Sequence, residues 1–214
     1  LVNGSQLAFF ILFNLLAGPG ADGVNRRLLL PVVPEYLGYG AQGLGEDFFV
    51  SHKPLLHHTG PQRFKYALDT ENLAVGADIG ALCVSRPTNP SGNLLTTGEM
   101  DQLLAVARSA NVPLLVDLAY GSPFPGVVYQ ASANPWRPGA VHVLSLSKLG
   151  LPGVRTSIVV ADEALIRCVT RANTIMTLAT SNLGPMLLER LITSGDLARL
   201  SGQLLPDFYR SQRD

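Results

Sequence analysis

The sequence has little that would attract a polyanion or chelate a metal. Its 16 Lys+Arg balance its 16 Asp+Glu, so the net charge is zero and only 15% of the residues are charged. Without a basic field there is no counterion release to support binding to nucleic acid or to an acidic membrane. The two cysteines, Cys83 and Cys168, stand far apart within apolar runs, which excludes a zinc ribbon or a disulfide framework and predicts both as small core residues. None of the 4 histidines has ligand-like spacing, so we expect no metal site, no nucleic-acid partner and no membrane partner.

Long hydrophobic runs are also missing. The most apolar stretch, Leu7–Ala17, is too short to cross a bilayer, is interrupted by Asn14, and has neither the basic flank nor the cleavage site of a signal peptide. We therefore expect a cytoplasmic protein, whose 214 residues, 47% of them hydrophobic, suffice for one substantial core. Because Leu1 leads almost directly into a helical segment, we also expect the chain to be a piece of a longer protein.

Short runs rich in Leu, Val and Ile predict the strands of a covered sheet. Each run has strand length and is apolar on both faces, which is typical of parallel strands that helices cover on both sides. The expected strands are 27–33, 79–85, 112–116, 141–146 and 154–161. The polar or Gly/Pro-rich segments 36–45, 51–65 and 130–138 are expected to be loops.

Helical patterns alternate with these runs. Residues 6–17 are apolar all round, as in a helix buried against a sheet, and Thr96-Thr97-Gly98-Glu99 is a capping box that precedes apolar residues at helical spacing. Further helices are expected from Asp162 toward Thr180 and over 183–192. This alternation predicts an α/β fold, a three-layer sandwich with a mostly parallel central sheet.

Polar groups follow three of the expected strands, and in such sheets ligands bind beyond the carboxyl ends of the strands. Asp117 and Tyr120 follow one strand, Asn89-Pro90-Ser91-Gly92 follows another, and Ser147-Lys148 follows a third. Each group has an ordinary structural alternative. Asp117 could cap a helix, the Asn89 segment could be a simple turn, and Lys148 could be a surface lysine.

Taken together in this order, the motifs resemble those of the fold type I pyridoxal-phosphate enzymes, in particular the class I/II aminotransferases. The resemblance rests on Asn89-Pro-Ser-Gly, Asp117-Leu-Ala-Tyr120 and Ser145-Leu-Ser-Lys148, with Arg155 seven residues on. It implies the large domain of that fold, pyridoxal 5'-phosphate as cofactor, and transfer of an amino group between an amino acid and a 2-oxo acid. Within the family, the stretches 34–39, 84–90 and 145–155 look most like the enzymes that act on valine and pyruvate, which would give 3-methyl-2-oxobutanoate and alanine.

The resemblance also implies a role for each motif residue. Lys148 would be the catalytic residue, bonded to the cofactor aldehyde and later acting as the base. Asp117 would pair with the pyridine nitrogen and keep it protonated, so that the ring withdraws electrons from the substrate. Tyr120 and Asn89 would donate hydrogen bonds to the phenolic oxygen of the ring.

For the phosphate, the resemblance nominates the backbone amides of Ser5 and Gln6, the Ser145 hydroxyl and the Arg155 guanidinium. General chemistry agrees, because a helix N-terminus favours an anion and arginine offers it a bidentate fork. Tyr36 stands where relatives place an aromatic ring on the cofactor ring, although it could also be a plain loop aromatic.

The same resemblance suggests how the chain is organised. Residues 1–190 would be the cofactor-binding large domain, without its N-terminal part, and 191–214 would begin the connection to a small C-terminal domain. Relatives bind the substrate carboxylate through an arginine near the C-terminus, but Arg199, Arg210 and Arg213 stand in no recognisable motif. We expect a homodimer when the protein is complete. Two alternatives stay open, a cofactor-binding regulatory module without turnover and a lyase on the same scaffold.

Overall fold

A seven-stranded sheet lies at the centre of the computed structural model, which describes residues 1–128 and 133–213. The strands follow the order β1-β2-β6-β7-β8-β9, and β3 pairs with β2 beside this path. The neighbours from β2 to β8 are parallel, whereas β1 and β9 are antiparallel to the strands they border. The strands are β1 (Gly18–Pro19), β2 (Asn25–Leu30), β3 (Phe49–Ser51), β6 (Ile79–Ser85), β7 (Leu114–Asp117), β8 (Ala140–Ser145) and β9 (Ser157–Val160). The predicted mostly parallel sheet is confirmed.

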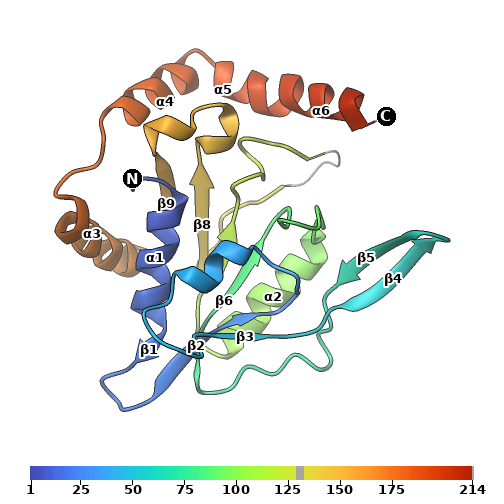
Figure 1. Ribbon diagram of the computed structural model, residues 1–214, viewed down its shortest axis with the longest axis vertical. Helices are drawn as coiled ribbons and strands as arrows, with labels where there is room; N and C mark the ends of the chain where they lie inside the picture. The colour runs from blue at the N-terminus through green and yellow to red at the C-terminus, as the bar shows by residue number, and fades with distance from the viewer. Residues whose placement is uncertain (129–132, 214) are drawn as a thin grey trace.

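Helices cover both faces of the sheet (Figure 1). On one face Phe9, Phe13 and Val169 pack with the sheet, and on the other face Leu103 and Leu188 do so. The first face belongs to α1 (Ser5–Leu16) and α3 (Glu163–Thr177), and the second to α2 (Thr97–Ser109), α4 (Leu183–Thr193) and α5 (Asp196–Arg199). The chain then continues through the π-helical turn η4 (Leu200–Leu204) into α6 (Leu205–Arg213). The predicted three-layer sandwich is therefore confirmed.

Three predicted strands are shorter in the structure than expected, and among them β7 begins at Leu114, two residues later than predicted. β2 begins two residues earlier than expected and ends at Leu30, because Pro31 has no N–H to continue the ladder. β9 begins only at Ser157, since residues 152–154 form a 3-10 turn and Arg155 has a left-handed φ of 44°. Strands β6 and β8 lie close to their expected positions, which fixes the carboxyl edge of the sheet.

The prediction of loops at 36–45 and 51–65 is wrong in part. The first segment contains the 3-10 helix η1 (Leu37–Ala41), and the second forms most of an antiparallel hairpin, β4 (Leu55–Gly60) and β5 (Arg63–Ala67). This hairpin projects from the sheet (Figure 1), and most of its residues are exposed. Its sequence has no apolar face because neither side of β4 is covered. The expected loop 130–138 falls partly outside the described residues.

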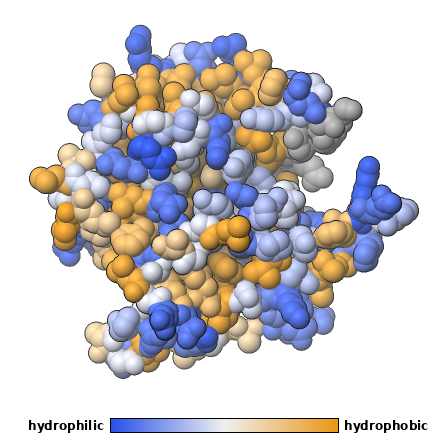
Figure 2. Space-filling model, in the orientation of Figure 1, coloured by the Kyte–Doolittle hydropathy of each residue, from blue (hydrophilic) through white to orange (hydrophobic). Residues whose placement is uncertain are grey.

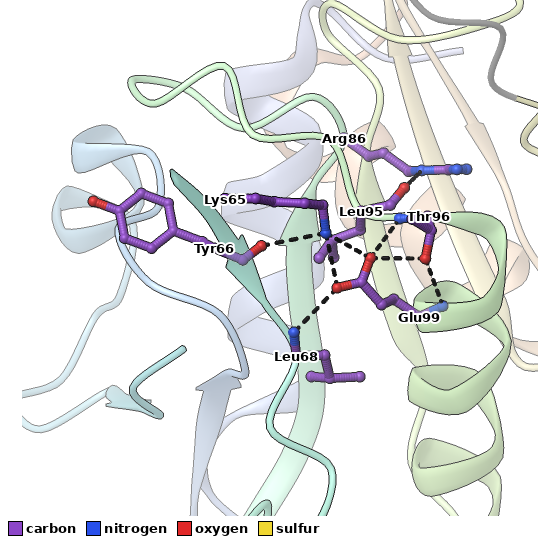
Figure 3. A network of polar contacts seen from close by, with 7 residues as sticks. All are labelled: Lys65, Tyr66, Leu68, Arg86, Leu95, Thr96 and Glu99. Atoms are coloured by element: carbon purple, nitrogen blue, oxygen red, sulfur yellow. Dashed lines mark hydrogen bonds and ion pairs between the residues drawn. The ribbon is translucent and has the colours of Figure 1, made fainter. Parts of the chain in front are cut away.

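A polar network attaches the base of this hairpin to the start of α2 (Figure 3). The Glu99 carboxylate accepts hydrogen bonds from Lys65 Nζ at 2.8 and 2.9 Å, from the Leu68 backbone N–H at 3.1 Å, and from the Thr96 backbone N–H at 2.7 Å. Thr96 Oγ1 in turn accepts from the Glu99 backbone N–H, which completes the predicted capping box. One carboxylate thus joins β5 to α2.

The two cysteines differ in their environment. Cys83 is buried in β6, as predicted, but Cys168 is exposed, so its expected place in the core is wrong. The reason is helical geometry, because α3 turns Val169 to the core and one residue along a helix lies about 100° round its axis. No helix in the described part of the chain is long and apolar enough to span a membrane.

Candidate active site at the carboxyl edge of the sheet

A cavity of about 310 Å³ lies at the carboxyl ends of β6, β7 and β8. The strand ends meet there because Ser85 pairs in register with Asp117, and Asp117 with Val143. All nine site residues expected from the sequence line this one cavity. They are Ser5, Gln6, Tyr36, Asn89, Asp117, Tyr120, Ser145, Lys148 and Arg155. The fold therefore gathers residues that are up to 150 positions apart in the chain.

Asp117 is the buried acidic group of the cavity. Only 8% of it is exposed, its Oδ1 accepts the Ala119 backbone N–H at 2.8 Å, and its Oδ2 accepts the Tyr39 hydroxyl at 2.8 Å. Burial raises the pKa of Asp117, although these two hydrogen bonds act in the opposite direction. No lysine or arginine forms an ion pair with Asp117 within the described ranges. The carboxylate can therefore still accept a cationic partner from the cavity.

Lys148 lies just beyond the neighbouring strand β8, in the 3-10 turn η2 (Ser147–Leu149). Its Nζ stands 5.1 Å from the centre of the Tyr120 ring, a cation–π distance. Among the described residues, neither Lys148 Nζ, the Tyr120 hydroxyl nor the Asn89 amide has a hydrogen-bond partner. Three polar groups around the cavity thus remain available to a ligand.

At one end of the cavity lie groups that favour an anion. The backbone pairing of Val2 with Ser157 sets the start of α1 beside β9, with N–H···O distances of 2.9 and 3.0 Å. Gly4, the residue before α1, has a φ of 90°, and a Cβ there would lie 2.3 Å from the Arg155 guanidinium. The helix N-terminus and a guanidinium therefore converge, a combination suited to a phosphate or carboxylate.

Serine hydroxyls complete this anion-binding end. Arg155 Nη1 donates to Ser147 Oγ at 3.4 Å, and the Ser147 backbone N–H donates to Ser145 Oγ at 3.2 Å. Ser5 opens the first turn of α1 and has no side-chain capping bond. Tyr36 lines the cavity with 38% of its surface exposed, and its ring stands perpendicular to the buried Tyr39 ring with 5.5 Å between the ring centres.

Four further buried polar residues belong to this site and were not predicted from the sequence, namely Glu35, Tyr39, Gln42 and Ser85. Tyr39 is 2% exposed and holds Asp117, while Glu35 binds Ser85 at the end of β6. Burial raises the pKa of Glu35 to about 8. Gln42 lines the cavity and its Oε1 is buried without a partner among the described residues. No local sequence pattern marks Glu35 and Tyr39, because their partners, Ser85 and Asp117, lie 50 and 78 positions away in the chain.

Fold and cavity together define an α/β protein with a cavity beyond the carboxyl ends of a mostly parallel sheet, the position where proteins of this class usually bind ligands. Comparison with known families makes this class more specific. Residues 57–204 match the family described as aminotransferase class I and II. The chain belongs to that family, so the resemblance seen in the sequence is confirmed.

Individual relatives are similar over nearly the whole chain. The chain is 46% identical over 209 residues to the valine–pyruvate aminotransferase of Escherichia coli (strain K12), a match that covers 98% of this chain and 50% of the relative. The solved valine-pyruvate aminotransferase of Salmonella typhimurium LT2 superimposes with a TM-score of 0.90 at 41% identity, over 98% of this chain and 52% of that one. A variant of Thermus thermophilus aspartate aminotransferase, 18% identical with a TM-score of 0.82 over 100% of this chain and 56% of that one, shows the shared fold alone. The chain thus spans about half the length of the relatives it matches.

Proposed function

We propose that this chain is the cofactor-binding part of a pyridoxal-phosphate-dependent aminotransferase that exchanges an amino group between valine and pyruvate, giving 3-methyl-2-oxobutanoate and alanine. The observation that carries the proposal is the single cavity into which Lys148, Asp117 and the anion-binding end with Arg155 all face. The valine–pyruvate pair is supported by the 46% identity to the E. coli enzyme of that name. Amino transfer is favoured over a regulatory or lyase role because the relatives reported above are all named aminotransferases.

The residues present fit pyridoxal phosphate at both of its ends. The phosphate would bind at the first turn of α1, held by the Ser5 and Gln6 amides, Ser145 and Arg155. Away from the phosphate, Asp117 offers a buried carboxylate that pairs with no lysine or arginine among the described residues. A protonated pyridine nitrogen would supply this missing charge and so lower the pKa of Asp117 toward its ordinary range.

The sides of the cavity suit the rest of the cofactor. Asn89 and Tyr120 offer donors for the phenolic oxygen, and Tyr36 offers an aromatic surface for the ring. When bound, pyridoxal phosphate supplies an aldehyde that condenses with an amine and a ring that accepts electrons from the substrate Cα. Lys148 Nζ would hold the aldehyde carbon until the substrate amine replaces it there, and the released lysine amine would then take the proton from the substrate Cα and return it to the former aldehyde carbon.

The proposal extends to the organisation of the protein. Residues 1–190 would form the cofactor-binding large domain and 191–214 the start of the connection to a small domain. Leu188 and Leu197, on either side of this boundary, both pack on the large-domain core, so the connection would begin on its surface. We further propose a cytoplasmic homodimer as the assembled form.

Hydride reduction of the protein with bound pyridoxal phosphate tests the assignment. The reduced pyridoxyl group should be found by peptide mapping on Lys148, and Lys148→Ala should abolish both the label and alanine formation from valine and pyruvate. Lys53→Ala is the matched control, because Lys53 does not line the cavity. Label on Lys53 or Lys65 would contradict the proposed site. Label on Lys148 without alanine formation by the full-length protein would contradict the proposed reaction.

A further inference from the structure

Glu35 is a buried carboxyl group to which the proposed function gives no role. It is 8% exposed, lies between β2 and η1, and does not line the cavity itself. Its Oε1 accepts the Ser85 backbone N–H at 2.9 Å, and its Oε2 is hydrogen-bonded to the Ser85 hydroxyl. Ser85 is the last residue of β6 and lines the cavity. Glu35 therefore reaches the cofactor site through one residue.

A second carboxyl group stands close to this pair. Ser85 is the register partner of Asp117 on the adjacent parallel strand, so Glu35, Ser85 and Asp117 follow one another across the end of the sheet. The other titratable groups that act on them are the Tyr39 hydroxyl and the Cys83 thiol, both buried and both uncharged in their ordinary state. In the part of the chain that the structure describes, no lysine or arginine pairs with either carboxyl group.

Burial raises the pKa of Glu35, and the nearby charge of Asp117 raises it further, so ionisation of Glu35 beside an ionised Asp117 is disfavoured. Asp117 is better placed to hold the charge, since it faces the cavity, where a cationic ring nitrogen can reach it. It also accepts hydrogen bonds from Tyr39 and Ala119. Glu35 is separated from the cavity by Ser85, so the proton belongs on Glu35.

A protonated Glu35 changes what the Ser85 hydroxyl can do. A neutral acid has one donor and one free carbonyl oxygen, so Oε2–H can donate to Ser85 Oγ while Oε1 keeps the bond from the Ser85 backbone N–H. A hydroxyl group has a single proton. When Ser85 Oγ accepts from Glu35, that proton is free to be donated elsewhere.

We propose that Glu35 is a positioning residue that, as a neutral carboxylic acid, turns the Ser85 hydroxyl proton into the cofactor cavity and leaves Asp117 as the only negative charge beside the ring. The inference rests on the proposed function, because it assigns these residues to the pyridoxal-phosphate site. The group that the Ser85 hydroxyl would face is the ring edge of that cofactor. Ionised Glu35 would instead accept the Ser85 proton and add a second charge to the site.

The test compares Glu35→Gln with Glu35→Ala in the full-length protein. Glutamine imitates the neutral acid, with an amide donor for Ser85 Oγ and a carbonyl acceptor for the backbone N–H, so it should rescue the defect of the alanine variant. We expect Glu35→Ala to bind pyridoxal phosphate about tenfold or more weakly, and Glu35→Gln to stay within about threefold of the unsubstituted protein at neutral pH. Glu46→Gln, at an exposed carboxyl group, is the matched control.

Two spectroscopic readouts separate this role from a merely structural one. Infrared spectra of the cofactor-free protein near pH 6 should contain the carbonyl band of a protonated carboxylic acid, and Glu35→Gln should remove that band. In the loaded protein the cofactor absorbance should change as the pH rises through the pKa of Glu35, and Glu35→Gln should abolish this transition while Glu46→Gln keeps it.

The outcomes distinguish the two proposals. If Glu35→Gln weakens cofactor binding as much as Glu35→Ala, or if the infrared band survives in Glu35→Gln, the positioning role is overturned although the proposed function stands. If the unsubstituted full-length protein itself binds no pyridoxal phosphate, both are overturned. Should Glu35→Ala fail to fold, the glutamine variant alone decides, because it replaces one hydrogen-bonding group by another of the same shape.

Discussion

Tyr39 shows how a single side chain prepares the carboxylate of this site. Its hydroxyl donates to Asp117 Oδ2 at 2.8 Å. The residue is 2% exposed, and the centre of its ring lies 5.3 Å from the ring centres of Phe9 and Phe13. Burial and the nearby Asp117 raise the pKa of Tyr39 well above its ordinary value, so the hydroxyl keeps its proton and stays a donor. A fixed donor stabilises the ionised form of Asp117.

We predict that Tyr39→Phe weakens the site without removing it. Loss of this hydrogen bond to a charged group should cost about 1.5–3 kcal/mol, or roughly 10–150-fold in cofactor affinity or turnover. The same hydrogen bond also decides in which direction the pH dependence of cofactor binding should shift. Without the donor the pKa of Asp117 rises further, so the acid limb of cofactor binding should move to higher pH. Binding titrations across the acid range check this, with Tyr209→Phe as a control that should match the unsubstituted protein.

The site residues that stand in recognisable motifs could be predicted from the sequence, whereas those outside such motifs could not. Asp117 and Lys148 could be found because each follows an apolar strand, where parallel sheets bind ligands. Glu35 and Tyr39 act through partners 50 and 78 positions away, Ser85 and Asp117. No local pattern encodes such long-range pairs, so only the folded chain shows them.

At the scale of elements, the start of α1 depends on one glycine. Gly4 has a φ of 90°, which L side chains rarely adopt, and its missing Cβ leaves room for the Arg155 guanidinium. Arg155 itself has a left-handed φ of 44°, at the end of the 3-10 turn η3 (Pro152–Val154). The helix N-terminus and the arginine can therefore share one anion only while residue 4 has no side chain.

We expect Gly4→Ala to displace the Arg155 guanidinium from the helix start and to strain the backbone before α1. Pyridoxal phosphate should then bind at least about tenfold more weakly, because a charge-assisted contact to its phosphate is lost. Equilibrium dialysis with pyridoxal phosphate measures the loss. Gly98→Ala is the control, since a Cβ there meets nothing within 4 Å and alanine favours the α2 helix. Unchanged affinity in Gly4→Ala would show that the phosphate is held elsewhere.

The elements themselves were predictable where burial imposes a pattern. β6 is buried along its whole length, and its bounds agree with the apolar run in the sequence. The hairpin of β4 and β5 was not predictable in this way, because a strand exposed on both sides has no reason to alternate apolar and polar residues. The antiparallel direction of β9 also leaves no local trace, since it depends on the short 3-10 turns that reverse the chain after β8.

At the scale of the molecule, exposed apolar side chains gather along α3 and α4. Ile175 and Leu178 are 85% and 88% exposed, and Met186 is 63% exposed. Figure 2 shows hydrophobic side chains over the α4 and α5 region on the face in view. Apolar surface of this kind is typical of an interface rather than of a solvent-facing helix, which supports the proposed homodimer.

Once the cofactor is bound, the cationic side chains described in the cavity would all be in contact with it. Lys148 and Arg155 are the only lysine and arginine among its described lining residues, and they would serve the aldehyde and the phosphate. Toward the C-terminus, Arg199 and Arg210 are exposed and pair with Asp196 and Asp207 within their own helical turns. No described cation is left in the cavity to anchor the carboxylate of an amino-acid substrate.

We therefore predict that cofactor binding and turnover separate when residues 1–214 are compared with the full-length protein. The 214-residue chain should bind pyridoxal phosphate and form the bond at Lys148, but form alanine from valine and pyruvate far more slowly. Without a carboxylate anchor the Cα–H bond is not held perpendicular to the cofactor ring, and positioning of this kind can contribute up to roughly 7–11 kcal/mol. A coupled assay of alanine formation on both proteins, with absorbance to count bound cofactor, measures the two steps independently. Equal rates per bound cofactor would place the carboxylate anchor within residues 1–214 and contradict this division of the site.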